Sequence, residues 1–336
     1  MTETSRSSVP ITLRIGFVVI GRNEGDRLIR CLDSLTVQRD SAIVYVDSGS
    51  TDQSVAEAEK RRAQVVRLDM TRPFTAGRAR NEGFAALHAR IADLQYVQFI
   101  DGDCELAEGW LDSAIQFLDE RPDVAIVCGR RREREPGASI YNQFCDIEWN
   151  TPIGEADACG GDALVRAAPF SEVGGFTALL IAGEEPELCL RLRDRGWRIW
   201  RLDSAMTTHD AAMHRFAQWW IRSVRSGFGY AQVWYATKDQ PLRLYGKELF
   251  RATIWAAFLP LAMIAIGGAN PKLGLALLGA YGIQVTRIAI RRDAMRTASW
   301  VYGFFTVLAK FPELLGAARF FIQYRRERAS HAILYK

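Results

Sequence analysis

The stretch that decides the fold is Tyr96-Val-Gln-Phe-Ile100, which runs directly into Asp101-Gly-Asp103. A short apolar run bounded by polar residues predicts a buried strand, and this one ends in two carboxylates that are one residue apart. Carboxylates at a strand end lie at the edge of the sheet, where they can hold a hard divalent cation such as Mg²⁺ or Mn²⁺. Taken alone, the motif has a simple turn as its alternative, because Asp and Gly are common in turns.

Outward from this strand, apolar β-branched runs alternate with helical patterns, which predicts an α/β fold with a mostly parallel, Rossmann-like sheet flanked by helices. Ligands bind beyond the carboxyl ends of the strands in such sheets, and Asp47 and Asp101 both fall at strand ends. From about residue 130 to 151 the pattern breaks, which predicts an irregular, substrate-facing excursion. Further strands are predicted at 15–20, 43–46, 65–68 and 124–127, and helices at 28–35, 79–87 and 110–118.

Charge is distributed unevenly along the 336 residues. Residues 1–204 carry 25 Lys and Arg against 33 Asp and Glu, whereas residues 205–336 carry 18 against 6. The acidic part suits metal chemistry, and the basic, apolar part suits an anionic membrane surface. Nucleic-acid binding is disfavoured, because the basic residues flank apolar runs instead of forming a continuous stripe.

The cysteines and the N-terminus both indicate a cytoplasmic first domain. None of the six cysteines forms a C-x-x-C pair, and most lie in apolar stretches, so we expect reduced and buried thiols. The first ten residues are polar and lack the apolar core of a signal peptide. We therefore expect a disordered segment at 1–12, followed by the first domain at 13–210.

Two apolar runs in the tail predict a transmembrane hairpin over 251–292. Residues 252–269 carry no charge, and after Asn270-Pro271-Lys272 a second uncharged run covers 273–286. A membrane-spanning helix needs roughly 17 to 25 residues, so the first run qualifies, and the second can extend because Arg287 can snorkel. Basic residues flank both outer ends, which predicts cytoplasmic ends and a location at the inner (cytoplasmic) membrane.

Amphipathic segments are predicted on either side of this hairpin. Residues 211–250 are expected to form interfacial helices, and residues 297–336 an amphipathic helix with a basic tail on the cytoplasmic face. A third crossing would place Arg325 and Arg326 on the wrong side for the orientation rule. Burial of all three apolar stretches in a soluble core is the alternative, given their marginal lengths.

Five motifs occur in a distinctive order in the first domain: Val18–Gly25, Val46–Asp52, Gly77–Gly83, Phe99–Asp103 and Gly183–Arg193. Their order and spacing over about residues 13–210 resemble the family 2 glycosyltransferases of the GT-A fold. The resemblance implies an inverting transfer of a sugar from a nucleotide-diphosphate donor. It does not cover the helical, membrane-associated tail equally well.

The resemblance also implies a donor pocket built from the loops of four of these motifs. Many relatives of this type carry two acids where this chain has Asp47-Ser48, and only the first is present here. The donor-binding residues that it implies are Arg22, Asn23, Glu24, Asp47, Ser48, Arg80, Asn81 and Asp101.

Asp101 and Asp103 match the metal- and donor-binding motif of the family, with Asp103 as the more direct ligand of Mg²⁺ or Mn²⁺. His209 lies where this fold often supplies a late histidine to the same metal, and imidazole can join an oxygen-rich Mn²⁺ site. Such a cation neutralises charge that develops on the leaving nucleotide. A structural role for a lone histidine is the alternative.

Glu184-Glu185 matches the Glu-Asp pair that the family carries at the start of a helix, which implies that Glu185 is the general base. A neighbouring carboxylate and partial burial raise a carboxyl pKa towards neutrality, which suits this role. Whether Glu184 or Glu185 reaches the acceptor stays open, and both acids also complement the helix dipole. The loop Gly160-Gly161-Asp162 resembles the acceptor-side glycine loop of the family, where a glycine lets the backbone approach the ligand.

The sequence therefore predicts a membrane-associated, metal-dependent glycosyltransferase with a nucleotide-sugar donor, a lipid-linked or polysaccharide acceptor and no nucleic-acid partner. A non-catalytic nucleotide-sugar-binding membrane adaptor is one alternative, supported by Ser48 and by Glu185 in place of an Asp. A nucleotidyltransferase on a similar sheet is another. Signatures of P-loop ATPases, dinucleotide-dependent oxidoreductases, zinc proteases and serine hydrolases are absent from the sequence.

Overall fold

The computed structural model describes residues 15–36, 42–240 and 243–334, the last eight of these as backbone only. The disordered segment expected at 1–12 lies outside the described residues. The chain divides into two compact units, and each consists of three segments. The first comprises Met1–Arg134, Trp149–Leu179 and Glu184–Ala211, and the second comprises Glu135–Glu148, Leu180–Gly183 and Ala212–Lys336.

Within the described residues, a single sheet of nine strands forms the centre of the first unit. Its path runs β3-β2-β1-β4-β8-β6-β9-β5, and β7 pairs with β9 beside this path. The half that contains β3, β2, β1 and β4 is parallel, as predicted, whereas β8 lies antiparallel between β4 and β6. The strands are β1 (Ile15–Gly21), β2 (Ala42–Asp47), β3 (Gln64–Arg67), β4 (Tyr96–Asp101), β5 (Cys104–Leu106), β6 (Val124–Glu133), β7 (Gly154–Ala156), β8 (Ala163–Arg166) and β9 (Arg198–His209).

The register of the parallel strands brings the predicted loops together. Gly21 of β1 lies beside Asp47 of β2, and Ile20 of β1 lies beside Asp101 of β4. The carboxyl ends of these three strands therefore meet at one edge of the sheet, where ligands bind in this class of fold.

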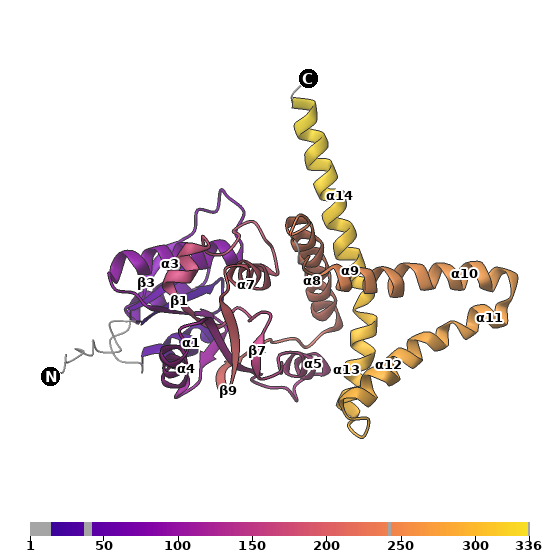
Figure 1. Ribbon diagram of the computed structural model, residues 1–336, viewed down its shortest axis with the longest axis horizontal. Coiled ribbons are helices and arrows are strands. Elements are labelled where there is room, and N and C mark those ends of the chain that lie inside the picture. Colours follow the sequence, from indigo (N-terminus) through magenta and orange to yellow (C-terminus); the bar gives the residue numbers. More distant parts are fainter. Residues whose placement is uncertain (1–14, 37–41, 241–242, 335–336) are drawn as a thin grey trace. The chain divides into compact units, whose positions relative to one another are not determined.

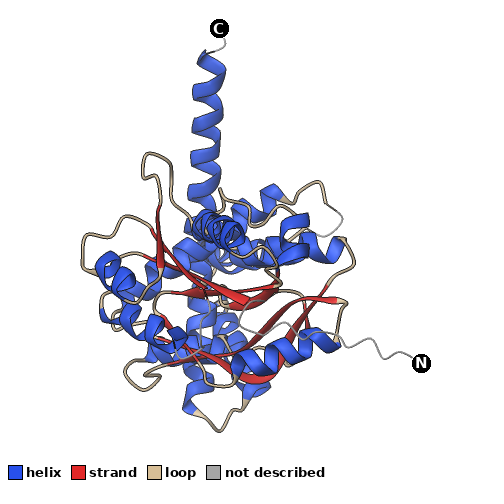
Figure 2. Ribbon diagram, turned by 90° about the vertical axis from the view of Figure 1, so that its left-hand side faces the viewer, coloured by secondary structure: helices blue, strands red, loops and turns tan. Residues whose placement is uncertain are grey.

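Helices cover both faces of this sheet. Figure 1 shows α3 on one side of β1 and β3 and shows α1 and α4 on the other, and Figure 2 shows the strands as a twisted sheet between helices. In α1, an apolar stripe with helical spacing, from Leu28 to Leu35, is buried. The helices of the first unit are α1 (Asp26–Thr36), α2 (Ser54–Lys60), α3 (Ala76–Arg90), α4 (Trp110–Glu120), α6 (Ala167–Glu172) and α7 (Glu184–Asp194).

Helix α3 packs closely against β1 and β2 because of Gly83. A Cβ atom at this position would lie 2.4 Å from Cγ1 of Val18 and 2.8 Å from Cγ2 of Val46. The missing side chain therefore fixes how closely α3 approaches the sheet. Arg80 lies about one turn earlier on the same helix, so this packing also sets the position of its guanidinium.

The prediction of an irregular excursion between residues 130 and 151 is wrong. Strand β6 continues to Glu133, and α5 (Ile140–Glu148) follows it. The charges of β6 look like those of a loop, but Arg131 forms ion pairs with Asp101 and Asp162. Phe144 of α5 belongs to a buried apolar cluster of the second unit together with Trp219 and Phe305.

The second unit is helical. Among its described residues, two continuous helical stretches, Gly246–Ala269 and Pro271–Arg292, are long and apolar enough to cross a membrane. Only 6% and 11% of their most apolar windows are buried, so they are not core helices of this unit, although two such helices are only a weak indication of membrane association. Its helices are α5, α8 (Phe216–Ala236), α9 (Gly246–Thr253), the π-helical Ile254–Phe258, α10 (Leu259–Ala269), α11 (Pro271–Ala276), α12 (Leu278–Arg292), α13 (Thr297–Leu308) and α14 (Lys310–Leu334).

The C-terminal segment that the sequence assigns to one amphipathic helix divides into α13 and α14. Pro312 lies in the first turn of α14, where its missing backbone N–H is tolerated. In a continuous helix, the proline ring would clash with the carbonyl group of Leu308, the last residue of α13. The proline therefore accounts for the break.

Replacing Gly83 with alanine tests the packing of α3. We expect Gly83→Ala to lower the free energy of unfolding by about 1–3 kcal/mol, because the added methyl group would overlap Val18 and Val46. Thermal or urea unfolding of the purified protein measures the change. Gly137→Ala is the matched control, since a Cβ atom there has open space around it. Equal stability of the two variants would contradict this account.

Candidate functional site

A single buried guanidinium connects the strand-end acid with the acids at the start of α7. Arg80, whose side chain is 3% exposed, donates from Nη2 to Oδ1 of Asp101 at 2.8 Å. Its Nη1 donates to Oε1 of Glu184 at 2.9 Å and to Oε1 of Glu185 at 3.4 Å. Residues that lie up to 105 positions apart in the sequence thus form one charged cluster at the carboxyl edge of the sheet.

Asp101 is held by two arginines. Besides the contact with Arg80, its Oδ2 accepts a hydrogen bond from Nη2 of Arg131 at 3.0 Å. Burial works against ionisation of this carboxyl group, but the charges of Arg80 and Arg131 outweigh it and hold the pKa of Asp101 at about 2. Asp101 is therefore an anion with both carboxylate oxygens engaged.

Asp162, predicted on the acceptor side, lies beneath this cluster. It is 1% exposed, and its Oδ1 accepts the backbone N–H of Asp101 at 3.0 Å. Its Oδ2 accepts hydrogen bonds from Nε of Arg131 at 2.9 Å and from the Thr207 hydroxyl at 2.7 Å. The Asp162 side chain thus links the end of β4 to Arg131 and Thr207 by hydrogen bonds.

The two glycines of the same loop differ sharply in their surroundings. A Cβ atom at Gly161 would lie 2.3 Å from Nη2 of Arg80 and 3.2 Å from Oε1 of Glu185. A Cβ atom at Gly160 would have no heavy atom within 4 Å. Only Gly161 must therefore lack a side chain for the cluster to form.

Glu185 is the titratable acid of the cluster. Burial, followed by the negative charge of Glu184, raises the pKa of Glu185 to about 7, and Arg80 only partly opposes this. Its side chain is 17% exposed, against 6% for Glu184. Glu184 also lies closer to Arg80, so Glu185 is the more accessible of the two and the one that exchanges a proton near neutral pH.

Asp103 and His209 form a second group, because β5 and β9 pair antiparallel and place Cys104 opposite His209. Oδ2 of Asp103 lies 3.2 Å from Nε2 of His209. The buried Nδ1 of His209 makes no hydrogen bond within the described residues, and Oε2 of Glu133 lies 3.8 Å from it. The ring of Trp149 packs edge-on against the imidazole at 4.7 Å.

This second group fits a divalent cation. Asp103 offers a carboxylate oxygen and His209 a ring nitrogen, and a carboxylate near the other ring nitrogen is the usual arrangement behind a metal-bound histidine. Burial raises the pKa of the intervening Cys104, which therefore stays a neutral thiol and a poor ligand. The predicted third ligand, Asp101, does not join this group, because its oxygens face Arg80 and Arg131.

The loops that follow β1 and β2 are joined by hydrogen bonds. Asn23 has a positive φ of 57°, donates its backbone N–H to the Ser50 hydroxyl at 2.9 Å and accepts the N–H of Thr51 on Oδ1 at 2.7 Å. The Asp47 carboxylate, 4% exposed, accepts the N–H groups of Gly49 and Ser50 at 3.1 Å each. Asp47 therefore shapes its own loop.

The remaining predicted donor residues lie in different environments. Arg22 is exposed and stacks over the ring of Phe74, with its Cζ 5.1 Å from the ring centroid. Burial, and then the charge of Asp103, raise the pKa of Glu24, so this acid is close to the candidate metal pair. Ser48 is buried, and its backbone N–H bonds to the carbonyl of Gly21 at 3.1 Å.

Asn81 does not join the cluster. Its amide donates to the backbone carbonyl of Phe176 at 2.8 Å and accepts the N–H of the same residue at 2.9 Å. This pair of bonds fastens α3 to the turn that precedes α7. The side chain therefore has a structural position, although its neighbour Arg80 lies at the centre of the site.

Sequence reasoning missed Arg131 and Glu133, which contact Asp101 and approach His209 respectively. Both lie in the stretch read as irregular. Their spacing of two residues, a few positions after the apolar run at 124–127, was the available signal, because such spacing places both side chains on the same face of a strand.

Part of the chain is similar to known proteins. Residues 17–173 match the model of the protein family described as Glycosyl transferase family 2. A pre-mycofactocin glycosyltransferase of Mycobacterium tuberculosis is 29% identical over 187 residues, which is 51% of this chain and 38% of that protein. A TPR repeat-containing protein of Synechococcus elongatus is 30% identical over 140 residues, which is 41% of this chain and 32% of that protein. The chain thus matches less than two fifths of the length of these curated relatives.

Among solved structures, a mannosyltransferase from Pyrobaculum calidifontis in complex with GDP-Man and Mn²⁺ has the same fold. It superimposes with a TM-score of 0.61 at 16% identity, and the match covers 90% of this chain and 87% of that one. The family match shows that residues 17–173 form a domain of the Glycosyl transferase family 2 type, as predicted, and the structural likeness shows that the chain has the predicted GT-A-type fold.

Proposed function

We propose that this enzyme transfers a sugar from a nucleotide-diphosphate sugar to a hydroxyl group of a membrane-proximal acceptor, with inversion, and that Glu185 is the general base. One observation carries the proposal: Arg80 holds the strand-end acid Asp101 and the pair Glu184-Glu185 in a single cluster. Donor-side and base-side groups are therefore neighbours, as a direct displacement requires.

The displacement assigns a simple role to Glu185. Its carboxylate accepts the proton of the acceptor hydroxyl group while the acceptor oxygen forms a bond to the anomeric carbon. The bond between that carbon and the diphosphate oxygen breaks on the opposite face, and the nucleoside diphosphate leaves. A base with a pKa of about 7 suits this proton transfer near neutral pH, because it is substantially ionised and still basic.

Arg80 holds the acids around Glu185 in place through ion pairs. It lies 2.9 Å from Glu184 and 3.4 Å from Glu185, so its positive charge is directed mainly towards Glu184 and Asp101. We assign Arg80 and Asp101 to positioning of the donor side, in place of a direct metal-binding role for Asp101. This assignment follows from the two arginines that occupy the oxygens of Asp101.

Asp103 and His209 are the residues that we assign to a divalent cation, Mg²⁺ or Mn²⁺. When bound there, such a cation supplies Lewis-acid neutralisation of charge on the leaving diphosphate. Support comes from the pairing of these two side chains and from the Mn²⁺ in the mannosyltransferase of the same fold. The joined loops at Asn23 and Asp47 would line the nucleotide.

The acceptor is proposed to be lipid-linked or part of a surface polysaccharide, at the cytoplasmic face of the inner membrane. The support is the two candidate membrane-spanning helices and the excess of basic residues at their outer ends. The proposed order is a catalytic domain at 13–210, interfacial helices at 211–250, the hairpin at 251–292 and an amphipathic segment at 297–336. GDP-Man, bound by the mannosyltransferase of this fold, is the first donor to test.

A donor panel tests the function directly. Purified protein is incubated with nucleotide sugars and Mn²⁺ or Mg²⁺, and nucleoside diphosphate release is measured. We expect release with at least one donor, loss of release with EDTA, and a loss of about 10²–10³-fold in Asp103→Asn, because this change removes a charge that faces the cation. Tight donor binding without release would instead favour a non-catalytic adaptor, and pyrophosphate release from a nucleoside triphosphate would favour a nucleotidyltransferase.

The pH dependence identifies the base. Because Glu185 must be ionised to accept a proton, kcat/KM should rise with pH and level off above a pKa of about 7. Glu184→Gln removes the charge that raises this pKa, so the rising limb should move to lower pH. Glu185→Gln should abolish the limb and lower kcat by about 10²–10⁴-fold. If Glu184→Gln abolished the limb and Glu185→Gln kept it, the roles of the two acids would be reversed.

The glycine loop offers a matched pair of variants. Gly161→Ala should lower kcat/KM by at least about tenfold, because the new methyl group would displace the Arg80 guanidinium from its acids. Gly160→Ala should keep activity within about threefold, since its surroundings are open. Thermal unfolding verifies that both variants fold. Equal activity of the two would contradict the role given to the cluster.

A further inference from the structure

A basic cavity lies at one end of the candidate hairpin in the second unit. It has a volume of about 470 Å³ and is lined by residues of α9, the π-helical segment, α12, α13 and α14. No acid is among its lining residues. The basic residues that line it are Arg251, Arg287, Arg291 and Lys310.

Three of these charges form no ion pair with the residues that the structure describes. Lys310 pairs with Glu313 at 2.6 Å, which offsets its charge. For Arg251, Arg287 and Arg291, the described part of the chain provides no ion pair within 4.0 Å. Three guanidinium groups around one cavity repel one another unless an anion lies between them, so the cavity is suited to an anionic ligand.

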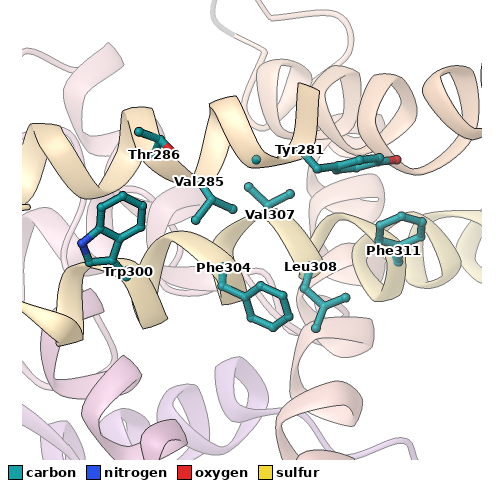
Figure 3. Close-up of a pocket in the computed structure, with 9 residues that line it drawn as sticks. Tyr281, Val285, Thr286, Trp300, Phe304, Val307, Leu308 and Phe311 are labelled. Atoms are coloured by element: carbon teal, nitrogen blue, oxygen red, sulfur yellow. The ribbon is translucent and has the colours of Figure 1, made fainter. Parts of the chain in front are cut away.

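An apolar groove adjoins this cavity. It has a volume of about 530 Å³, and Val307 lines both hollows. Figure 3 shows Tyr281, Val285 and Thr286 on one helix and Trp300, Phe304, Val307 and Leu308 on the other, with their side chains around the groove. No lining residue of the groove is charged. A basic hollow and an uncharged one therefore share a wall.

We infer that the two hollows form one binding site for a lipid that carries a phosphate-type headgroup. Guanidinium groups bind phosphate oxygens through paired hydrogen bonds, which accounts for the basic cavity. A hydrocarbon chain fills the uncharged groove and removes apolar surface from water. A free anion would use only the first hollow and a neutral apolar ligand only the second, whereas an anionic lipid uses both.

The position of the basic cavity along the candidate spans agrees with the position of lipid headgroups in a bilayer. Asn270 joins the two candidate spans, and Arg251 and Arg287 lie 19 and 17 residues from it on the two sides. At ~1.5 Å per helical residue, these separations correspond to about 26–29 Å, close to the ~30 Å thickness of the bilayer hydrocarbon. The arginines therefore fall where phosphate groups lie. The inference thus rests on the proposed membrane location, but it does not depend on the proposed catalytic roles.

Native mass spectrometry of the full chain in a neutral detergent tests the inference. Four probes are titrated separately: phosphatidylglycerol, a polyprenyl phosphate, phosphatidylcholine and inorganic phosphate. We expect one tightly bound molecule per chain for at least one of the two anionic lipids, and binding about tenfold or more weaker for phosphatidylcholine and for inorganic phosphate. The anionic lipid that binds with the higher affinity identifies the source of the headgroup, which is either a bilayer phospholipid or a phosphorylated carrier lipid.

Two pairs of variants separate the halves of the site. Arg287→Gln with Arg291→Gln should weaken anionic lipid binding about tenfold or more, whereas Arg319→Gln with Arg325→Gln, which removes the same charge outside the cavity, should change it less than about twofold. Gly282→Trp should fill the groove and weaken lipid binding without affecting inorganic phosphate, because a Cβ atom there has open space. Gly279→Trp, three residues earlier and outside the groove lining, is its control.

Equal losses in the two arginine pairs, or equal binding of phosphatidylcholine and both anionic lipids, would overturn the inference. An unchanged lipid affinity in Gly282→Trp would do so as well. Nucleoside diphosphate release is measured in parallel with the same variants and a saturating donor. In the wild type, release of nucleoside diphosphate without binding of either anionic lipid contradicts the lipid site alone, whereas lipid binding without release contradicts the proposed function alone.

Discussion

The contact on which the site depends is that of the buried Arg80 guanidinium with three carboxylates from two distant segments. A buried charge is tolerated only when it is paired, and removing one partner of such a pair typically costs about 3–5 kcal/mol. Without Arg80, the carboxylates of Asp101, Glu184 and Glu185 would face one another with only Arg131 nearby. The same guanidinium fixes the charge state of the strand end and requires a glycine at position 161.

The fold brings Arg80 to this place through ordinary packing. Parallel pairing puts the ends of β1, β2 and β4 at one edge, and the close approach of α3 at Gly83 sets the height of the helix above the sheet. Asn81, bonded to the backbone of Phe176, then ties α3 to the segment before α7. The charged cluster is therefore positioned by strand register, close helix packing and hydrogen bonds outside the cluster itself.

Much of this arrangement could be predicted from the sequence. Strong apolar runs indicated β1 to β4, helical spacing indicated α1, α3 and α4, and the strand-end acid Asp101 indicated the edge of the sheet at which the charged cluster lies. The partners of each acid could not be predicted, because Arg131 lies 30 residues from Asp101 in the sequence and on β6, which β8 separates from β4 in the sheet. The metal role expected for Asp101 stays a prediction, and its oxygens face the guanidinium groups of Arg80 and Arg131. The antiparallel β8 was also missed, since short strands give weak periodicity.

Helix α5 has a consequence for dividing the protein. It is enclosed in sequence by the first unit, yet Phe144 is buried with Trp219 and Phe305, which come from the C-terminal helices. A fragment that stops at residue 210 would keep α5 and lose the aromatic residues that cover it. The uncovered face would be an exposed apolar surface, which promotes self-association. We therefore expect a fragment truncated after the first unit to stay monomeric in solution only if Phe144 and its apolar neighbours on α5 are replaced by polar residues.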